Sequence, residues 1–453
     1  MRSSTSDLTP GRTGRHGSHS FAITTLGCKV NQYESDLMAA QLQLQGCMEC
    51  TPRDGVDLCI VNTCTVTKRA SVQSRQAIRR MSRAHPRARL IVTGCYAQNA
   101  PEEIAGLEGV AGIVGNTHKD MIPLMADRAP TVPLPLVLRQ DISRHTLFST
   151  PPLTVCGRRA RPLLKIQDGC SAFCTYCIVP HTRGPSRSMP GKEVITHLRQ
   201  LRALGFEEAV LTGIHIGCWG LDFSPSTSLL HLLKEIERVP DTPCIRLSSL
   251  NPNEVTSDFL RQVEASDRLR PHFHLSLQSG DDEILRKMHR PYSRQGFRDI
   301  VYALKDLLPD AAIGVDVLVG FPGESERAFE NTCILLGELP VSYLHVFPFS
   351  PRTGTPANRY PHQVAPDVLN RRCGKLRSVG RKKRTAFYTS MIGKKLEFVV
   401  EGPVKNCATL WKGVSANYVP ALFEPVDSAA GKSISAVVQE VTSENRVLAQ
   451  CNA

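Results

Sequence analysis

Three cysteines, Cys170, Cys174 and Cys177, stand close together in the run DGCSAFCTYCIVP, and we call them the loop triplet. Their C-x3-C-x2-C spacing is too tight for a disulfide framework and suits the thiolate ligands of one iron–sulfur cluster. A cubane [4Fe–4S] cluster normally takes four thiolates, so three leave one iron open to a ligand that is not protein. Zinc is the less suitable alternative, because structural zinc needs four ligands and usually paired CxxC arms. The spacing therefore predicts a cluster with a reactive iron.

Three further cysteines each follow a short apolar segment, and we call them the strand-end triplet. Cys28 ends FAITTLGC, Cys64 ends DLCIVNTC and Cys95 ends RLIVTGC. Each segment predicts a strand followed by a helix, and parallel strands gather ligands at their carboxyl ends. These thiols should therefore meet at one sheet edge and hold a second cluster, with buried core cysteines as the alternative. The isolated CxxC of Cys47 and Cys50 has no partner pair, so we assign it no ligand role.

The composition favours an intracellular metalloenzyme with a polyanionic partner. Sixteen cysteines without a regular framework suit a reducing compartment, so we expect a cytoplasmic protein. The sequence has no run of about 18 apolar residues, and no membrane partner is expected. Lys and Arg number 55 against 42 Asp and Glu, and the resulting formal charge of +13 favours binding to nucleic acid.

Changes in composition divide the chain into domains that must position the two triplets. Residues 1–20 predict a disordered leader, residues 21–129 a parallel α/β domain, and residues 130–157 an extended, Pro-rich linker. Residues 158–385 hold six strand candidates with helices between them: LLKIQ, AVLTG, CIRLSS, HFHLSL, AIGVDVLVG and YLHVFPF. Six β/α units are too few for a closed eight-stranded barrel. The predicted fold class is therefore α/β with a central partial (β/α)6 barrel, whose first strand precedes the loop triplet.

The last part of the chain combines a basic segment with a small β domain. Residues 369–395 contain ten basic residues and no acidic one on a helical pattern, which favours phosphate contact over a merely solvated face. Four short β runs in residues 386–453 predict a small β-barrel: LEFVVE, ATLWKGVS, YVPALFE and SISAVVQEV. The residues expected to contact nucleic acid are Arg371, Arg372, Arg381, Lys382, Lys383 and Arg384.

The order of these features resembles the radical S-adenosylmethionine (SAM) methylthiotransferases, whose last module is the TRAM nucleic-acid-binding domain. The motifs that carry the resemblance span nearly the whole chain: TLGCKVNQYES, VNTCTVT, VTGCYAQ, IQDGCSAFCTYCIVPHTRG, HLSLQSG, GFPGES and HVFPFSPRTGTPA. The chain departs from the family pattern at GDD, where GSD is frequent, and at SSLNP, where SSIEP is frequent. Neither departure touches a cluster ligand.

The resemblance implies a tRNA-modifying transferase with two [4Fe–4S] clusters and two SAM molecules per turnover. The loop triplet would hold the cluster that binds and cleaves SAM, and the strand-end triplet would hold an auxiliary cluster that carries sulfur. The barrel at residues 386–453 would be the TRAM-like domain, and the basic residues before it would bind tRNA. An electron donor such as flavodoxin or ferredoxin and a sulfur source are the further partners implied.

The run around the first strand-end cysteine favours one branch of this family. GCKVNQYES, with Lys29 after Cys28, is similar to the MtaB-type branch that acts on N6-threonylcarbamoyladenosine (t6A). The isopentenyladenosine branch typically reads GCQMN, and the ribosomal-protein branch has a lysine directly before the asparagine, where this chain has Val30. The resemblance therefore predicts methylthiolation of t6A at tRNA position 37 to ms2t6A. The alternatives are isopentenyladenosine in tRNA, a ribosomal-protein aspartate, or a non-enzymatic iron–sulfur protein that binds nucleic acid.

Further site residues are expected in the cluster loop and at the carboxyl ends of the barrel strands, with packing as the alternative role for each. The expected SAM contacts are Tyr176, Thr212, Gly213 and Ser276, and the candidates for a catalytic role are Asp316 and Gln278. Arg183 and Arg187 should either contact a phosphate or carboxylate or brace the loop. His274 and His345 should line the core or the cavity rather than bind metal.

Overall fold

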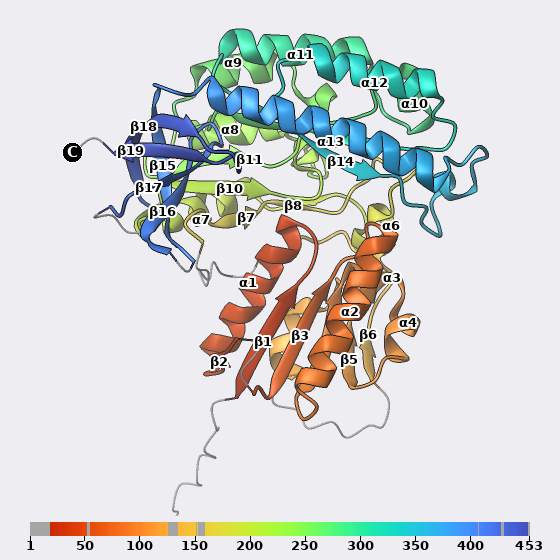
Figure 1. Cartoon of the computed structure of the whole chain (residues 1–453). Coiled ribbons are helices and arrows are strands. Elements are labelled where there is room, and N and C mark those ends of the chain that lie inside the picture. The colour runs from red at the N-terminus through yellow and green to blue at the C-terminus, as the bar shows by residue number, and fades with distance from the viewer. Residues whose placement is uncertain are drawn as a thin grey trace, which may run out of the picture.

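The computed structural model describes residues 19–51, 55–125, 135–150, 152, 159–405, 407–426 and 430–451. Nearly all of the predicted leader and part of the predicted linker lie outside these residues. Figure 1 shows an α/β domain in orange, a partial barrel of strands and helices in yellow to cyan, and a small β-barrel in blue beside it. The predicted fold class is confirmed in each of these parts.

The N-terminal domain is a six-stranded parallel sheet with strand order β2-β1-β3-β4-β5-β6. Its strands are β1 (Ser20–Thr25), β2 (Met48–Glu49), β3 (Leu58–Thr63), β4 (Arg89–Gly94), β5 (Val110–Val114) and β6 (Leu136–Leu138). Its helices are α1 (Lys29–Leu44), α2 (Lys68–Ala84), α3 (Cys95–Asn99), α4 (Pro101–Ala105) and α5 (Ile122–Met125). One core lies under α1 and α5, and another under α2, α3 and α4, so both faces of the sheet are covered. Such burial explains why the strands are continuous apolar runs.

This sheet extends past the domain boundary predicted at residue 129. Strand β6 pairs in parallel with β5, with Leu136 opposite Gly112, and it lies within the predicted linker. Strand β6 has only three residues and stands in a Pro-rich stretch, so periodicity gives no signal for it. The α/β domain therefore includes the first part of the segment predicted as linker.

All six predicted strands of the partial barrel are present. They are β7 (Leu163–Lys165), β10 (Glu208–Thr212), β11 (Cys244–Leu247), β12 (His272–Gln278), β13 (Ala312–Val319) and β14 (Tyr343–Pro348). They form two parallel sheets, β11-β10-β7 and β12-β13-β14, which a bridge between Leu250 and Leu275 connects. Spatial order follows chain order, which is the arrangement expected of an open (β/α)6 barrel.

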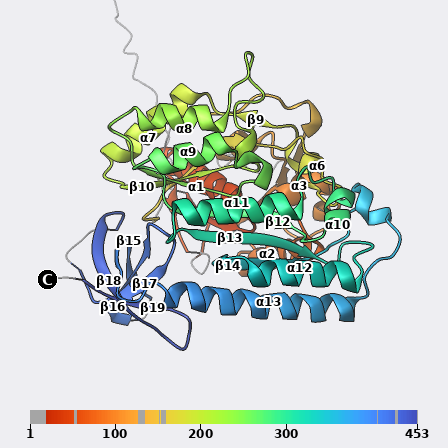
Figure 2. The ribbon, with the colours of Figure 1, turned by 90° about the horizontal axis from the view of Figure 1, so that it is seen from above.

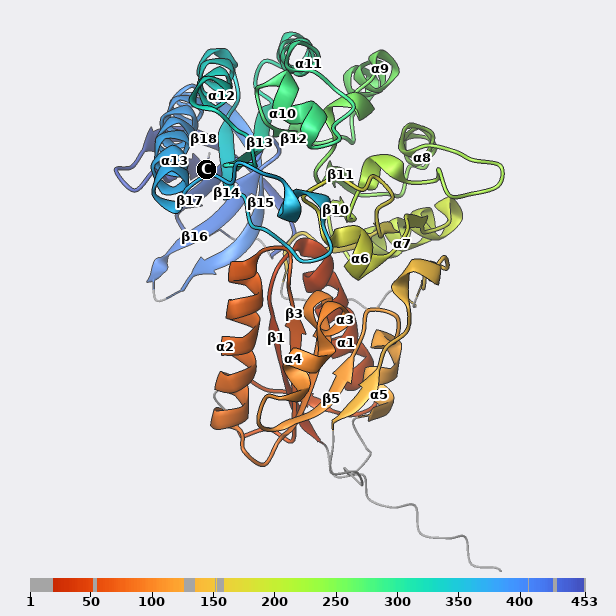
Figure 3. The ribbon, with the colours of Figure 1, turned by 90° about the vertical axis from the view of Figure 1, so that its right-hand side faces the viewer.

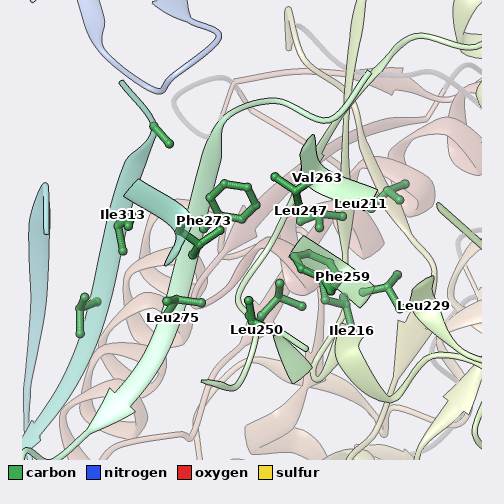
Figure 4. Packing of buried hydrophobic residues seen from close by; sticks show 14 of the residues in the cluster. Leu211, Ile216, Leu229, Leu247, Leu250, Phe259, Val263, Phe273, Leu275 and Ile313 are labelled. Atoms are coloured by element: carbon green, nitrogen blue, oxygen red, sulfur yellow. The ribbon is translucent and has the colours of Figure 1, made fainter. Parts of the chain in front are cut away.

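Helices cover the outside of the partial barrel (Figure 2). They are α7 (Gly191–Ala203), α8 (Leu229–Glu237), α9 (Ser257–Ala265), α11 (Arg294–Leu307) and α12 (Glu326–Glu338). Between them and the strands lies one continuous apolar core, in which the rings of Phe259 and Phe273 meet edge to face at 6.5 Å (Figure 4). Around the loop triplet are short elements: β8 (Gln167–Asp168), α6 (Val179–Arg183), β9 (Arg187–Ser188) and α10 (Asp282–Lys287).

The chain ends in a long helix and a closed β-barrel. Helix α13 (Pro366–Thr389) runs along the outside of the partial barrel and leads to the β-barrel (Figure 2). The barrel strands are β15 (Lys395–Val404), β16 (Cys407–Ser415), β17 (Pro420–Phe423), β18 (Ser433–Val441) and β19 (Val447–Cys451). The ring of Tyr418 stacks at 4.0 Å on His272, so the β-barrel packs against the amino-terminal ends of the partial-barrel strands. Within the described ranges, none of the helices has the length and apolar character needed to cross a membrane.

Candidate active site

The cysteines of the strand-end triplet lie at neighbouring strand ends. Cys64 directly follows β3 and Cys95 directly follows β4, and the two strands pair in register up to Thr63 opposite Gly94. Cys28 follows β1, which pairs with β3 on its other side. The strand order reverses between β1 and β3, and open α/β sheets bind ligands at that crevice. The structure therefore brings these thiols to the edge that the sequence predicts.

Two glycines allow these turns to approach one another. Gly94 has φ +96° and ψ −167°, a region that only glycine readily adopts, and a Cβ there would lie 2.4 Å from the Thr63 carbonyl oxygen. Gly27 has φ +99°, and a Cβ there would lie 3.0 Å from the Sγ of Cys64. The glycine before the first cysteine (TLGC) and the glycine before the third (VTGC) are thus explained by the lack of space for a side chain.

An asparagine in the motif GCKVNQ ties two of the cysteine turns together. Asn31 Nδ2 donates to the carbonyl oxygens of Leu26, at 2.7 Å, and Thr63, at 2.9 Å. Asn62 Nδ2 in turn donates to the Asn31 carbonyl oxygen at 2.9 Å. These side chains hold the backbone before Cys28 against the backbone before Cys64. Sequence reasoning quoted the motif but did not assign Asn31 this role.

The chemistry of the donor set fits a metal cluster. The pKa of Cys64 is raised to about 12, chiefly by burial, and the neighbouring thiols of Cys95 and Cys28 contribute to this rise. Burial likewise raises the pKa of Cys177 to about 12, with the other two loop-triplet thiols adding to the rise. Thiols in such surroundings ionise when a metal coordinates them.

The spacing of the thiols does not suit a single metal ion. Among the described residues, two groups bring three donor atoms within 4.8 Å of one another, and neither triplet is one of them. A single zinc ion, with Zn–S bonds of about 2.3 Å, needs a tighter arrangement than a cubane does.

The loop triplet lies between β8 and α6, and neighbouring segments fix its backbone. The Cys170 amide donates to the Gly184 carbonyl oxygen at 2.9 Å. Thr175 donates through its amide to the Met288 carbonyl oxygen at 3.3 Å and accepts from the Ala357 amide at 2.8 Å. The contacts of Thr175 come from the residue after α10 and from the SPRTGTPA segment, which are remote in sequence. The loop is thus held in one conformation from several sides.

A histidine that sequence reasoning did not single out contacts the loop triplet. His215 Nδ1 lies 3.5 Å from Cys170 Sγ and 3.3 Å from Cys218 Sγ. Its Nε2 pairs with Glu254, and this pairing orients the ring. Although burial raises it, the hydrogen bond from His215 brings the pKa of Cys170 below its ordinary value. His215 stands two residues after Gly213 at the end of β10, which was the available signal.

The residues expected to contact SAM lie around this loop, and each also has a structural contact. The Tyr176 hydroxyl accepts a 2.6 Å hydrogen bond from Arg290 Nη2, and the pKa of Tyr176 is raised, chiefly by burial. Thr212 is buried in β10, and a Cβ on Gly213 would lie 2.9 Å from the Gln167 carbonyl oxygen. Ser276 presents its carbonyl oxygen to the Tyr292 hydroxyl. Their SAM contacts remain predictions.

The interior of the partial barrel carries polar side chains. Asp316 accepts hydrogen bonds from His274 Nε2 at 2.7 Å and His345 Nδ1 at 3.3 Å, which joins three neighbouring strands. Burial raises the pKa of Asp316, but the two histidines outweigh it and bring the pKa to about 2. Asp316 therefore stays ionised and orients the two rings, rather than exchanging protons near neutral pH. Gln278 is mostly buried with φ +66°, an unusual conformation for this residue type.

Lys29 brings a cation from the strand-end triplet to the barrel interior. The pKa of Lys29 is lowered to about 8, chiefly by burial and also by Arg246 and Arg161, while Asp316 opposes this shift. Lys29 has no hydrogen-bond or ion-pair partner among the residues that the structure describes. Its ammonium group is thus available to an anionic ligand between the two domains.

Arg183 and Arg187 are buried and make ion pairs, which favours their bracing role over contact with a phosphate. Arg183 Nη1 lies 2.6 Å from Glu34 Oε1 and 3.3 Å from both carboxylate oxygens of Asp168. Its Nε donates to the Cys95 Sγ at 3.3 Å. Arg187 Nη2 lies 3.3 Å from Asp168 Oδ2. Arg183 therefore joins the cluster loop to the N-terminal domain, whereas Arg187 braces the loop within its own domain.

Of the six basic residues expected to bind tRNA, four contact other residues of the protein and two are exposed. Arg372 is 4% exposed and pairs with Glu324 at 2.8 Å, and Lys383 donates to the carbonyl oxygens of Gly337 and Leu339. Arg371 pairs with Glu326 at 3.2 Å, and Arg384 lies over the ring of Tyr343. Arg381 and Lys382 are exposed. We therefore leave Arg372 out of the tRNA-binding set, because its guanidinium is buried in an ion pair that holds α13 in place.

Comparisons with known proteins agree with this geometry. Residues 20–115 match the model of the uncharacterized protein family UPF0004, and residues 164–336 match the Radical SAM superfamily. The threonylcarbamoyladenosine tRNA methylthiotransferase MtaB of Aquifex aeolicus is 36% identical over 84% of this chain and 92% of its own length. The protein of that name from Bacillus subtilis is 35% identical over 91% of this chain and 92% of its own.

More distant similarities fit the same picture. The tRNA-2-methylthio-N(6)-dimethylallyladenosine synthase of Clostridium botulinum is 30% identical over 85% of this chain and 87% of its own length. Among solved structures, the radical SAM methyltransferase TsrM of Kitasatospora setae superposes with a TM-score of 0.53 at 17% identity, over 75% of each chain. The likeness to TsrM concerns the fold alone.

Proposed function

Since the chain belongs to the radical SAM methylthiotransferase family, we propose that it converts t6A at position 37 of tRNA to ms2t6A. The observation that carries this proposal is the 35–36% identity over most of the chain to two enzymes named for threonylcarbamoyladenosine in tRNA. The two cysteine triplets on facing domains support it, because the reaction needs both a radical and a sulfur carrier.

The enzyme uses SAM and two [4Fe–4S] clusters, for which the two triplets provide the thiolates. With these groups bound, the chemistry supplied is hydrogen abstraction by a 5′-deoxyadenosyl radical and delivery of a methylthio group to C2 of the adenine base. The protein's own part is to hold the two triplets on adjoining domains, which the ion pair of Arg183 with Glu34 joins, and to admit the base. It does so with the sheet edge of the N-terminal domain and the open side of the partial barrel.

The base must leave its stack to reach the two triplets, as in other enzymes that act on a base. Phe347 near the end of β14 is 44% exposed, and its ring lies 6.3 Å from that of His345 in an edge-to-face arrangement. An exposed aromatic ring beside a histidine offers a stacking surface for a purine. These two side chains would therefore support the adenine of t6A.

Lys29 offers a basis for preferring t6A to an isopentenyl substrate. The threonylcarbamoyl group ends in a carboxylate, and the ammonium group of Lys29 has no partner among the described residues. A charge-assisted hydrogen bond to that carboxylate would satisfy it. An isopentenyl group offers no such partner, so its binding would leave the cation unpaired.

Exposed basic residues of α13 and the adjacent β-barrel would bind the tRNA backbone. Arg381 and Lys382 are exposed and lie in the second half of α13, the helix that leads to the barrel. Phosphate contacts of this kind supply affinity without sequence readout. Because its substrate is tRNA, we place the reaction in the cytoplasm, with a low-potential donor such as flavodoxin or ferredoxin and a separate sulfur source.

Mass spectrometry of tRNA nucleosides from a strain lacking the gene tests the proposal. Loss of ms2t6A with accumulation of t6A, restored by the wild-type gene, is the expected result. Loss of the isopentenyl product, or of a modified ribosomal aspartate, with ms2t6A unchanged would contradict it. Complementation with Lys29→Gln tests the role of the cation: ms2t6A should fall while purified Lys29→Gln still cleaves SAM at the wild-type rate.

A further inference from the structure

We infer that Arg183 is a positioning residue that fixes the auxiliary cluster against the SAM-cleaving loop and raises the reduction potential of that cluster through its hydrogen bond to Cys95. The inference rests on the proposed function, since it presumes a cluster on the strand-end triplet. It goes further in assigning a redox and positioning role to a side chain that is not a ligand. Three independent features of the structure support it.

The first feature is the place of Arg183 between the two triplets. Arg183 ends α6, which begins two residues after Cys177. The next residue, Gly184, accepts the hydrogen bond from the Cys170 amide at 2.9 Å. The side chain of Arg183 reaches the other way, to Cys95 Sγ at 3.3 Å. One short turn thus contacts a ligand of each cluster site, and Figures 1 and 3 show α6 at the contact between the two domains.

The second feature is that the guanidinium has every nitrogen engaged in a dry environment. Arg183 is 0% exposed. Its Nε donates to Cys95, its Nη1 to Glu34 and Asp168, and its Nη2 to Glu34 and Asn31. A buried charge held at five points keeps one orientation, and the planar fork of arginine makes this possible. Lysine offers no such geometry.

The third feature is an excess of positive charge in this buried group. Two carboxylates, Glu34 and Asp168, are in contact with four cations: Lys119, Lys165, Arg183 and Arg187. The net charge is four minus two, or +2, next to Cys95. A [4Fe–4S]2+ core with three thiolates carries −1, and an anionic sulfur ligand on the open iron brings it to −2. The charged group therefore complements a sulfur-loaded auxiliary cluster.

Net charge and hydrogen bonds to the sulfur ligands are among the factors that set the potential of an iron–sulfur cluster. A cation that donates to a thiolate stabilises the reduced form, which carries one more negative charge, and so raises the potential. The same contact restrains the direction of Cys95. Removing Arg183 should therefore lower the potential of the auxiliary cluster and loosen its position relative to the loop triplet.

The test uses the full chain with the loop triplet replaced by alanine, so that only the auxiliary cluster remains. Iron content and an EPR-monitored redox titration are compared for this parent and for the same protein with Arg183→Gln or Arg183→Lys. The matched control is Arg372→Gln, which removes another buried, ion-paired arginine far from both triplets in the chain. We expect a lower midpoint potential in Arg183→Gln, a smaller lowering in Arg183→Lys, and no change in the control.

An unchanged midpoint in Arg183→Gln, or an equal shift in Arg372→Gln, would overturn the inference. If Arg183→Gln does not retain iron, Arg183→Lys decides: a lowered midpoint supports the inference and an unchanged one overturns it. A parent without any auxiliary signal would overturn the proposed function, and the inference with it. In the enzyme with both triplets intact, Arg183→Gln should raise the ratio of 5′-deoxyadenosine to methylthiolated tRNA, and an unchanged ratio would count against the positioning role.

Discussion

The loop triplet and the strand-end triplet present three thiols each, but the chain assembles them differently. Cys170, Cys174 and Cys177 share one loop, so their spacing is visible in a single short segment of the sequence. Cys28, Cys64 and Cys95 stand at the ends of three strands and meet only when β1, β3 and β4 pair in register. The first site therefore depends on a local conformation, and the second depends on the integrity of a sheet.

The two sites also differ in the contacts that hold their cysteines in place. Backbone hydrogen bonds of Thr175, to the Met288 carbonyl oxygen and from the Ala357 amide, brace the loop triplet. The strand-end triplet is supported by buried side chains, Asn31 and Arg183, of which one comes from another domain. Changes to the sheet or to the domain contact should therefore affect the auxiliary cluster first, and the following variants test that difference.

The largest effect is expected from replacing the whole loop triplet by alanine. About half of the iron of the reconstituted protein should be lost, because one of two four-iron clusters is missing. SAM cleavage should be abolished, since the cluster that would bind and cleave SAM is missing. Iron analysis and chromatography of 5′-deoxyadenosine check this, and unchanged iron would contradict the ligand assignment.

Replacing the strand-end triplet by alanine should also halve the iron but separate the two activities. We expect 5′-deoxyadenosine to be formed still, because the loop triplet is intact, whereas no methylthiolated tRNA should appear. Simultaneous assay of both products measures the separation. Methylthio product from this variant would show that the sulfur carrier lies elsewhere.

A smaller effect should come from Gly94→Ala, which disturbs the strand-end site without removing a ligand. The Cβ would lie 2.4 Å from the Thr63 carbonyl oxygen, in a backbone region adopted essentially by glycine, so about 3 kcal/mol of stability should be lost. Gly46→Ala is the matched control: Gly46 also has positive φ (+84°), but nothing lies within 4 Å of the added carbon, and about 1 kcal/mol is expected.

Denaturant unfolding of both glycine variants, with the iron content of each, distinguishes these effects. Gly94→Ala should lose iron from the auxiliary site while retaining SAM cleavage. Equal iron loss from both sites would mean that the two triplets are not independent.

The smallest effect on the clusters is expected from charge reversal on α13, remote from both triplets in the chain. Arg381→Glu with Lys382→Glu should leave iron content and SAM cleavage unchanged. It should weaken tRNA binding by about tenfold and reduce the magnitude of the log–log salt slope by up to about 2, because two phosphate contacts are lost. Binding titrations at several salt concentrations measure this. Equal affinity of the variant and the parent at each concentration would exclude these two residues from the tRNA contact.

The sequence alone determined the elements and the two cysteine triplets of this protein. Both triplets were found from spacing and from strand patterns, because a cysteine after an apolar run is a local feature. The six strands of the partial barrel and four of the five strands of the terminal barrel were predicted because an apolar strand pattern is also a local feature. Strand β19 (Val447–Cys451) was missed, since five residues near the chain end give too weak a pattern.

Only the tertiary structure decided which charged and polar side chains serve the site. Arg183 lies 88 positions from Cys95 in the chain, so no local pattern connects the two residues. Arg372 does not differ from its basic neighbours in the sequence, and only the structure shows that it pairs with Glu324. His215 gains its contact with Cys170 from the packing of β10 beside the loop. Ion pairs and hydrogen bonds of this kind join residues from different elements, and their geometry arises from packing that no local pattern encodes. For that reason the sequence indicated where chemistry occurs, while the fold determined which side chains tune it.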